Sequence, residues 1–403
     1  MGSNGEIKRV GMLFSGGPAP AANAVISAAA LSFINAGVEV IGFYNGYERL
    51  ERFTPETPLV ENRDYRVISR DDVSGIRSDG AIYLRTARAN PGKPVKSFDD
   101  LADPEKNAKL RAVFGAFDQL QIDALVSIGG DDTLKTANYV LRIQDVVPGL
   151  RPVRVLHLPK TIDNDYFGID WTFGFMSAAE FIASEVRNLT ADAKSGNVWY
   201  VLEVMGRKAG WLTYAAGIAG GAHKMISVED FDEVFDLNVA ADEVAQLVET
   251  RRADGRAYGV ICMAEGLADM CPPEQRPQAV DEHGNAVLGS TMICRQLAEA
   301  TEKRLAETTG GSVKVRYKQV GYEARCTRPT AYDVILGSEL GVGACRGLVD
   351  EGLNGVMVSV EGQFDLRYVP FADLIDPNTL LTKLRFIERD SDFYRLARAL
   401  EYR

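Results

Sequence analysis

Short apolar runs alternate with longer helical segments along the whole chain, and this alternation limits the possible folds more than any other feature. Parallel strands need a crossover connection that is usually a helix, so the pattern predicts an α/β protein with doubly wound, mostly parallel sheets. The predicted strands lie at residues 7–14, 38–43, 81–84, 124–128, 153–158, 197–204, 258–264, 313–320 and 355–360. The predicted helices lie at residues 24–36, 107–121, a segment ending near 143, 176–192, 238–252, 290–308, 329–350 and 391–400, with an irregular excursion at 268–287.

Composition narrows the function classes. The 403 residues suffice for two domains or one large one, and the net charge of −11 argues against a nucleic-acid partner or an anionic membrane surface. No apolar run approaches the length of a membrane span and no signal peptide is evident, so we expect a cytoplasmic protein. The cysteines show no metal-ligand spacing and are expected to be reduced and mostly buried; they are Cys262, Cys271, Cys294, Cys326 and Cys345.

Glycine and charged residues recur where the predicted strands end. In an open α/β sheet, ligands bind outside the carboxyl ends of the strands, and five charged loops at such positions are hard to explain by chance. We therefore predict that these loops form a ligand site. They lie at residues 15–17, 129–132, 159–165, 205–207 and 321–325.

The loop at residues 159–165, Pro-Lys-Thr-Ile-Asp-Asn-Asp, carries the most chemistry. One of its carboxylates, Asp163 or Asp165, could accept a proton from a substrate hydroxyl, and Lys160 could neutralise a phosphate. The alternative is a polar turn with an Asx cap.

Two glycine loops precede predicted helices. Gly16 and Gly17 could present backbone N–H groups to a phosphate, although the loop is neither a Walker A motif nor GxGxxG and could be a tight turn. Asp131 and Asp132 follow a second glycine pair and suit a hydrated Mg²⁺ near phosphate, unless Asp132 or Thr133 only caps the helix.

A further pair of cations, Arg85 and Arg88, follows the predicted strand at residues 81–84. At a strand end these side chains could bind phosphate. The alternative is that both are solvated surface charges.

Together these loops resemble the phosphofructokinase family. The motifs Ser-Gly-Gly-Pro-Ala-Pro, Gly-Gly-Asp-Asp-Thr, Pro-Lys-Thr-Ile-Asp-Asn-Asp, Met-Gly-Arg and Gly-Tyr-x-x-Arg occur in the family's order, and the resemblance spans residues 7–361. Within the family the chain looks like the pyrophosphate-dependent branch, since the ATP-using members usually have glycine where Asp132 and Lys160 stand here.

The resemblance implies two Rossmann-like domains with the phosphofructokinase fold. Residues 1–174 with about 324–361 would bind the phosphoryl donor, residues 175–323 the sugar phosphate, and residues 362–403 would form a C-terminal extension packing on the core. It also implies a homodimer or homotetramer.

The activity implied is Mg²⁺-dependent, reversible transfer of a phosphoryl group from pyrophosphate to the 1-hydroxyl of fructose 6-phosphate. Products would be fructose 1,6-bisphosphate and phosphate. An ATP-dependent 6-phosphofructokinase, a kinase of another sugar phosphate such as sedoheptulose 7-phosphate, and a non-catalytic sugar-phosphate sensor or regulatory subunit remain as alternatives.

The resemblance also assigns roles to residues. Asp163 would be the general base, assisted in catalysis by Lys160, Asp132 and Arg207. The donor contacts would be Gly16, Gly17, Arg88, Gly130, Asp132 and Lys160. Sugar-phosphate contacts would be Thr161, Asp163, Met205, Gly206, Arg207, Glu265, Tyr322 and Arg325, with Arg316 supplied by a neighbouring subunit, and the Mg²⁺ positions would be Asp131 and Asp165.

Three positions depart from the family pattern. Ala21 stands where the first loop of the family usually has glycine, so the sequence does not decide the backbone conformation at this position. Val198 replaces an arginine that ATP-using relatives supply across the subunit interface. Leu84-Arg85 precedes Thr86 where relatives often have glycine, which leaves open the reach of Arg88. The last two leave the sugar phosphate less certain than the type of reaction.

Overall fold

The computed structural model describes residues 6–273, 276, 288–309 and 312–402, so most of the predicted excursion at residues 268–287 lies outside the described residues. The chain forms two compact units. Unit 1 comprises residues Met1–Ile162, Tyr166–Met176 and Arg325–Leu384. Unit 2 comprises residues Asp163–Asp165, Ser177–Ala324 and Arg385–Arg403.

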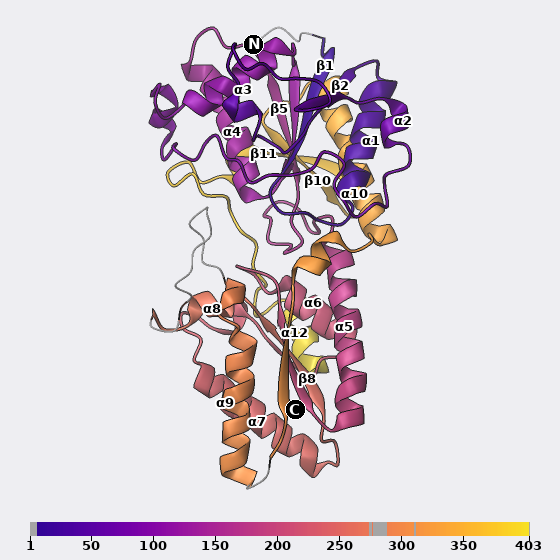
Figure 1. Cartoon of the computed structure of the whole chain (residues 1–403), viewed down its shortest axis with the longest axis vertical. Coiled ribbons are helices and arrows are strands. Elements are labelled where there is room, and N and C mark those ends of the chain that lie inside the picture. Colours follow the sequence, from indigo (N-terminus) through magenta and orange to yellow (C-terminus); the bar gives the residue numbers. More distant parts are fainter. Residues whose placement is uncertain (1–5, 274–275, 277–287, 310–311, 403) are drawn as a thin grey trace. The chain divides into compact units, whose positions relative to one another are not determined.

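Unit 1 is built on a seven-stranded sheet in the order β11-β10-β5-β4-β1-β2-β3 (Figure 1). Its five central strands are parallel, and the two edge strands, β3 and β11, run antiparallel to their neighbours. The strands are β1 Arg9–Ser15, β2 Glu39–Phe43, β3 Tyr65–Val67, β4 Ala124–Gly129, β5 Arg154–Pro159, β10 Val356–Glu361 and β11 Asp365–Pro370.

Helices cover both faces of this sheet, as a doubly wound fold requires. Figure 1 shows α1 and α10 on one side of the strands and α3 and α4 on the other. The helices of the unit are α1 Ala22–Asn35, α2 Arg70–Val73, α3 Ala108–Gln119, α4 Asp131–Val146, α10 Ala331–Cys345 and α11 Phe371–Leu374.

The close approach of α1 and α10 depends on two glycines. A Cβ on Gly341 would stand 2.6 Å from the Val25 carbonyl oxygen and 2.8 Å from the Ala29 nitrogen. A Cβ on Gly337 would stand 3.0 Å from the Val25 Cγ2 atom. The backbones of the two helices therefore meet where α10 has no side chain.

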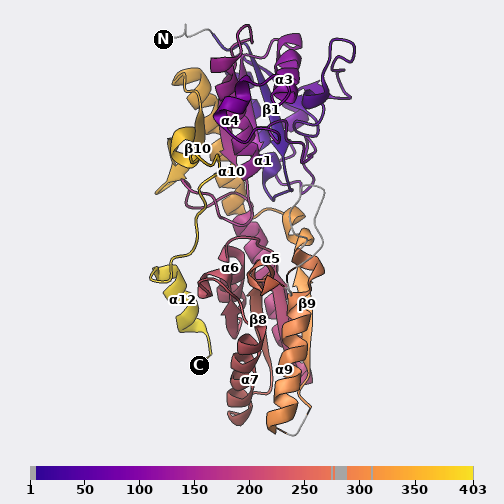
Figure 2. The same ribbon diagram turned by 90° about the vertical axis from the view of Figure 1, so that its left-hand side faces the viewer.

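Unit 2 has a four-stranded parallel sheet in the order β7-β8-β6-β9. Its strands are β6 Trp199–Val204, β7 Lys224–Ile226, β8 Gly259–Ala264 and β9 Val315–Val320. Its helices are α5 Phe175–Gly196, whose first two residues belong to unit 1, α6 Trp211–Gly220, α7 Leu237–Ala253, α8 Leu267–Met270, α9 Ile293–Thr309 and α12 Asp392–Leu400. Figure 2 shows α12 beside α6, away from α7 and α9.

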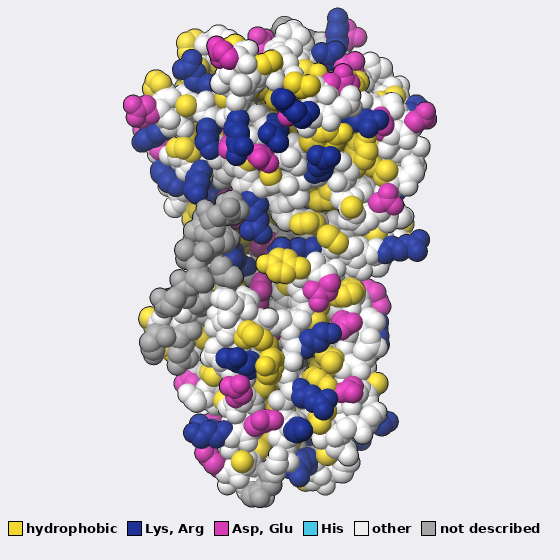
Figure 3. Space-filling view, viewed as in Figure 1, with side chains coloured by type: hydrophobic (Ala, Val, Ile, Leu, Met, Phe, Trp, Pro, Cys, Tyr) yellow, Lys and Arg dark blue, Asp and Glu magenta, His cyan; other side chains and the backbone are white. Residues whose placement is uncertain are grey.

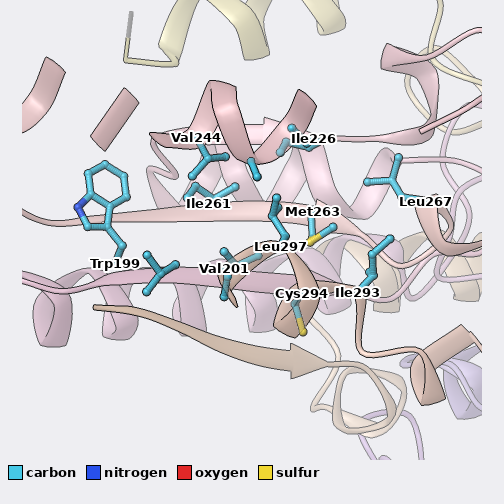
Figure 4. Packing of buried hydrophobic residues seen from close by; sticks show 14 of the residues in the cluster. Trp199, Val201, Ile226, Val244, Ile261, Met263, Leu267, Ile293, Cys294 and Leu297 are labelled. Atoms are coloured by element: carbon cyan, nitrogen blue, oxygen red, sulfur yellow. The ribbon is translucent and has the colours of Figure 1, made fainter. Parts of the chain in front are cut away.

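The core of unit 2 forms where α7 and α9 pack on one face of the sheet (Figure 4). Trp199 and Val201 of β6 point to this face with Ile261 and Met263 of β8, because alternate residues of a strand share one side. Val244 of α7 and Leu297 of α9 complete the layer. A core of this kind makes the ends of the strands rigid supports for loops.

The predicted fold class is confirmed, but residues 81–84 do not form the predicted strand. The backbone there turns, and the side chain of Asn23 binds it: Nδ2 donates to the Ala81 carbonyl at 2.6 Å and Oδ1 accepts from the Tyr83 amide at 2.8 Å. The sheet edge beside β2 is occupied by β3, which the sequence pattern did not predict.

The C-terminal part of the chain divides between the units. Residues 362–384 belong to unit 1, where β11 extends the sheet, and residues 385–403 belong to unit 2. All five cysteines are free, and all except the exposed Cys326 are buried, as predicted. Among the described residues, no helix combines the length and the apolar character needed to cross a membrane.

Candidate active site

In unit 1, three glycine-rich or charged loops begin side by side. Ser15 of β1 pairs in register with Gly129 of β4, and Gly129 pairs with Pro159 of β5. The loops that start at Gly16, Gly130 and Lys160 therefore leave the same edge of the sheet. This is the edge where open α/β sheets bind ligands.

Lys160 brings a buried positive charge to this edge. Lys160 is only 7% exposed, and its backbone amide donates to the Gly129 carbonyl at 2.9 Å. The Nζ atom lies 3.4 Å from the position a Cβ of Gly16 would occupy and 3.8 Å from that of Gly130. The structure thus brings three of the predicted donor-site residues together around one ammonium group.

The loop that carries Arg88 is tied to the same place. The Gly16 amide donates to the Ala87 carbonyl at 3.0 Å, and the Thr86 hydroxyl donates to the Gly16 carbonyl at 2.6 Å. Arg85, in contrast, has its guanidinium 5.0 Å from the centre of the Tyr44 ring. Arg88 directly follows Ala87, whose carbonyl is hydrogen-bonded to the first glycine loop. Of the two arginines, Arg88 is therefore the one held close to that loop.

Asp131 and Asp132 begin helix α4. Gly130 is the N-cap and makes no side-chain cap, so the alternative that Asp132 or Thr133 caps this helix is wrong. The Asp132 side chain is 66% exposed and binds Lys135 Nζ at 2.9 Å. Asp131 Oδ1 accepts from the Asp132 amide at 2.9 Å.

Arg325 and Ala21 add two findings that the sequence did not predict. The Arg325 guanidinium carbon lies 3.5 Å from the position a Cβ of Gly17 would occupy, so this arginine lies beside the first glycine loop within unit 1. Ala21 has φ 64, a left-handed backbone that costs an L-residue about 1 kcal/mol. The loop therefore takes a conformation typical of glycine although a methyl group is present.

Unit 2 presents a second group of loops. Val204 of β6 pairs in register with Ala264 of β8 and Val320 of β9. The Met205 amide donates to the Val320 carbonyl at 3.1 Å, and the Gly206 amide donates to Glu265 Oε1 at 3.2 Å. The structure therefore assembles the predicted sugar-phosphate residues after β6 and β8 beside the start of the loop after β9.

Glycine is required at two of these positions. Gly206 has φ 145, outside the range of ordinary side-chain-bearing residues. A Cβ on Gly266 would stand 2.4 Å from the Arg207 carbonyl oxygen.

Arg207 is half-buried, and Tyr322 is 75% exposed at the start of the turn after β9. Tyr322 thus projects from the loop that begins at Gly321.

Arg316 lies at the other end of the unit 2 sheet. It pairs in register with Tyr200, four residues before Val320, or about 13 Å along the strand. Its Nη1 atom donates to the Tyr200 hydroxyl at 2.8 Å and lies 3.2 Å from Asp192 Oδ2. Within its own unit, the structure does not bring Arg316 to the loops at the carboxyl ends.

The loop after β5 is divided between the units. Lys160 and Thr161 belong to unit 1, where the Thr161 carbonyl accepts from the Thr172 hydroxyl at 2.6 Å, whereas Asp163, Asn164 and Asp165 belong to unit 2. Asp163 and Asp165 are half-buried. The predicted base therefore lies in the unit that carries Met205, Gly206 and Glu265.

The acidic residues at the predicted metal positions suit a Mg²⁺ ion that takes few ligands from the protein. Among the described residues no group of three or more histidine, cysteine or acidic side chains could hold a metal ion. Mg²⁺ at phosphoryl-transfer sites commonly binds one or two carboxylates and completes its shell with water and phosphate. Single carboxylates such as Asp131 and Asp165 match that demand.

Comparison with known proteins agrees with this architecture. The family model described as Phosphofructokinase matches residues 9–348. A protein of Thermotoga maritima named Pyrophosphate--fructose 6-phosphate 1-phosphotransferase is 35% identical over 97% of this chain and 90% of its own length. An ATP-dependent 6-phosphofructokinase of Chloroflexus aggregans is 33% identical over 91% of this chain and 90% of its own.

A solved structure shares the fold. The pyrophosphate-dependent phosphofructokinase of Nitrosospira multiformis superposes with a TM-score of 0.70 over 98% of this chain and 92% of its own, at 19% identity. Open α/β units of this kind bind ligands in the crevice outside the carboxyl ends of their parallel strands. The chain belongs to the phosphofructokinase family, and it is a phosphotransferase.

Proposed function

We propose that the protein transfers a phosphoryl group reversibly from pyrophosphate to the 1-hydroxyl of fructose 6-phosphate, with Mg²⁺, in the cytoplasm. The observation that carries the choice of donor is Lys160, a buried ammonium beside the two glycine loops of unit 1. A short inorganic donor has charge on both phosphates and no nucleoside, so a compact cation suits it. The Thermotoga maritima relative supports the same choice.

Unit 1 would bind the donor and unit 2 the sugar phosphate. Gly16, Gly17 and Gly130 would offer backbone N–H groups, with Lys160 and Arg88 supplying charge. In unit 2, Met205, Gly206, Arg207, Glu265 and Tyr322 would hold the acceptor, and Arg325 keeps the sugar-phosphate role that the resemblance gives it. Thr161 would shape the loop of the base.

Asp163 would accept the proton of the 1-hydroxyl as the oxygen attacks phosphorus. Phosphoryl transfer depends mainly on positioning and on charge stabilisation, and Arg207 would stabilise the transferring group. Asp131 and Asp165 would hold Mg²⁺, which neutralises phosphate charge when bound. Glycine at Asp132 and Lys160 in ATP-using relatives suggests that these two side chains exclude the nucleotide.

The donor is tested by exchanging these two residues. Asp132→Gly should allow weak use of ATP, because it removes a side chain and a charge where an α-phosphate would lie. Lys160→Gly should raise the barrier for pyrophosphate by about 2–4 kcal/mol, the scale of one lost charge-stabilising group. The double variant should favour ATP relative to the parent, and non-additively, because both residues would touch one ligand.

The measurement is the ratio of kcat/KM for pyrophosphate to that for ATP, in the parent and the three variants, with ADP as a third donor. Arg142→Ala is the matched control, since it removes an exposed cation from the same helix α4. An unaltered ratio, or a parent that prefers ATP, contradicts the proposal. Binding of fructose 6-phosphate without turnover of any donor would favour the non-catalytic sensor. Faster turnover of sedoheptulose 7-phosphate than of fructose 6-phosphate would identify sedoheptulose 7-phosphate as the preferred acceptor.

A further inference from the structure

One residue near the C-terminus binds both peptide carbonyls that follow Asp163. The backbone amide of Arg385 donates to the Asp165 carbonyl at 2.9 Å. Its Nη2 atom donates to the Asn164 carbonyl at 3.1 Å. All of these residues belong to unit 2, so the contacts lie within one compact unit. Arg385 is therefore an anchor for the loop that carries Asp163.

Arg385 is itself held by Trp211, the first residue of α6. The guanidinium carbon lies 4.6 Å from the centre of a Trp211 ring, and the Trp211 Nε1 atom donates to the Arg385 carbonyl at 3.1 Å. Trp211 also packs against Phe393 of α12, with ring centroids 5.2 Å apart. Backbone and side chain of Arg385 are thus both fixed, which lowers the entropy cost of holding the loop.

The residues that follow Arg385 bind a second loop of unit 2. The Ile387 amide donates to Glu229 Oε1 at 3.4 Å, and the same oxygen accepts from the Gly210 amide at 2.9 Å. Gly210 closes the loop that begins at Met205 and Gly206. We call residues 385–389 the C-terminal strap, because this segment binds the loop of Asp163 directly and is linked to the loop after β6 through Glu229.

The backbone of Asn164 explains why an anchor is needed. Asn164 is fully buried and has φ 54, in the left-handed region, which asparagine adopts more readily than other side-chain-bearing residues but less readily than its usual conformations. Contacts from the surroundings therefore help to hold it there. The orientation of its carbonyl sets ψ of Asn164, and the bond from Arg385 fixes that orientation. Without the bond, the turn between Asp163 and Asp165 would have other conformations available.

We propose that Arg385 is a positioning residue for Asp163 and that it acts by holding the Asn164 and Asp165 carbonyls. This inference rests on the proposed phosphoryl transfer for the role of Asp163. The strap lies after residue 348, where the match to the family model ends. The positioning of the base therefore depends on a segment outside the part of the chain that defines the family.

The first test compares Arg385→Ala with the parent in steady-state kinetics with pyrophosphate and fructose 6-phosphate. We expect kcat to fall by about 10- to 100-fold, the scale of a misplaced reacting group, with KM for fructose 6-phosphate within about threefold. Arg385→Lys should recover part of kcat, since an ammonium can still stack on Trp211 and donate a hydrogen bond. Arg395→Ala, which removes a 66% exposed cation from α12, is the matched control and should keep the parent's kcat.

A double-mutant cycle separates positioning from a general loss of structure. If Arg385 acts through Asp163, adding Arg385→Ala to Asp163→Asn should lower kcat by less than about twofold. A full second loss in that background would overturn the proposal. So would parent-like kcat in Arg385→Ala.

Hydrogen–deuterium exchange provides a readout that does not depend on activity. Exchange in a peptide covering residues 162–168 should be faster in Arg385→Ala than in the parent or in Arg395→Ala, because the turn loses its anchor. Unchanged exchange overturns the proposed anchoring. If the parent turned over no donor, the proposed function would fail, and the exchange experiment would still decide whether Arg385 holds this loop.

Discussion

At the scale of single residues, His157 shows how burial sets the charge of a group beneath the site. It lies on β5 with its Nε2 atom 3.0 Å from the Tyr166 hydroxyl. Burial lowers its pKa from 6.5 to about 3. The histidine is therefore neutral in the folded protein, and Tyr166, bonded to it, begins the return of the chain into unit 1 after Asp165.

This pKa predicts an acid-dependent loss of stability. The unfolded chain binds a proton to His157 below about pH 6.5, whereas the folded chain does so only near pH 3, so stability contributed by the neutral form falls as pH drops between these values. Between about pH 6 and pH 4 the unfolding free energy of the parent should fall because of His157. In His157→Gln this fall should be about 2 kcal/mol smaller. Urea unfolding at several pH values measures the difference.

Tyr166→Phe is the control for that experiment, because it removes the hydroxyl partner and leaves the imidazole. Its pH dependence should match the parent's. A parent-like slope in His157→Gln would show that this histidine does not carry the effect.

At the scale of elements, the packing of α1 on α10 supports the first glycine loop. Helix α1 begins at Ala22, directly after the left-handed Ala21. The Ala21 carbonyl lies 3.3 Å from the position a Cβ of Gly337 would occupy. Close helix packing therefore extends to Ala21, the residue that ends the first glycine loop.

Gly341→Ala should destabilise unit 1 by about 1–3 kcal/mol, because the added methyl would meet backbone atoms of α1 at 2.6 Å and 2.8 Å. Gly337→Ala should cost less, since its nearest contact is a side-chain methyl at 3.0 Å and alanine favours the helix. Denaturant midpoints at constant m-value compare the two. Equal stability of both variants would contradict this view of the helix contact.

At the scale of the whole molecule, Arg316 raises the question of assembly. It lies on β9, an edge strand of the unit 2 sheet, far along that strand from the loops at the carboxyl ends of its own unit's strands. For an arginine in that place, the role to be tested is a contact to the site of another copy. The resemblance to the family assigns it that role, which stays a prediction, as does a homodimer or homotetramer.

We expect the active species to be at least a dimer, and Arg316→Ala to raise KM for fructose 6-phosphate about 10-fold or more by removing a charged hydrogen bond. Light scattering with a simultaneous activity assay across a dilution series measures the oligomeric state of the active species. Steady-state kinetics measures the KM of Arg316→Ala for fructose 6-phosphate. Lys314→Ala, at an exposed cation two residues earlier, is the matched control. Full activity in a monomeric fraction would exclude the shared arginine.

Charge on the face drawn in Figure 3 does not by itself mark out an anion site. Figure 3 shows lysine and arginine side chains interspersed with aspartate and glutamate on the drawn face of each unit. With a net charge of −11, attraction of phosphate depends on particular cations held at loops, such as Lys160.

The sequence by itself determined the fold class and the grouping of the loops. Apolar runs and helical segments are local patterns, and the carboxyl ends of neighbouring parallel strands necessarily share one edge. For this reason Gly16, Gly130 and Lys160 meet in unit 1, and Met205, Gly206 and Glu265 meet in unit 2, as their positions after strands predicted.

Only the tertiary structure decided the features that depend on distant partners. The edge strands β3 and β11, the turn held by Asn23 and the place of Arg325 beside Gly17 have no local signal, because each is set by a segment far away in the sequence. The same holds for the C-terminal strap. Arg385 and Asn164 stand 221 residues apart, and no periodicity or spacing records that one binds the other.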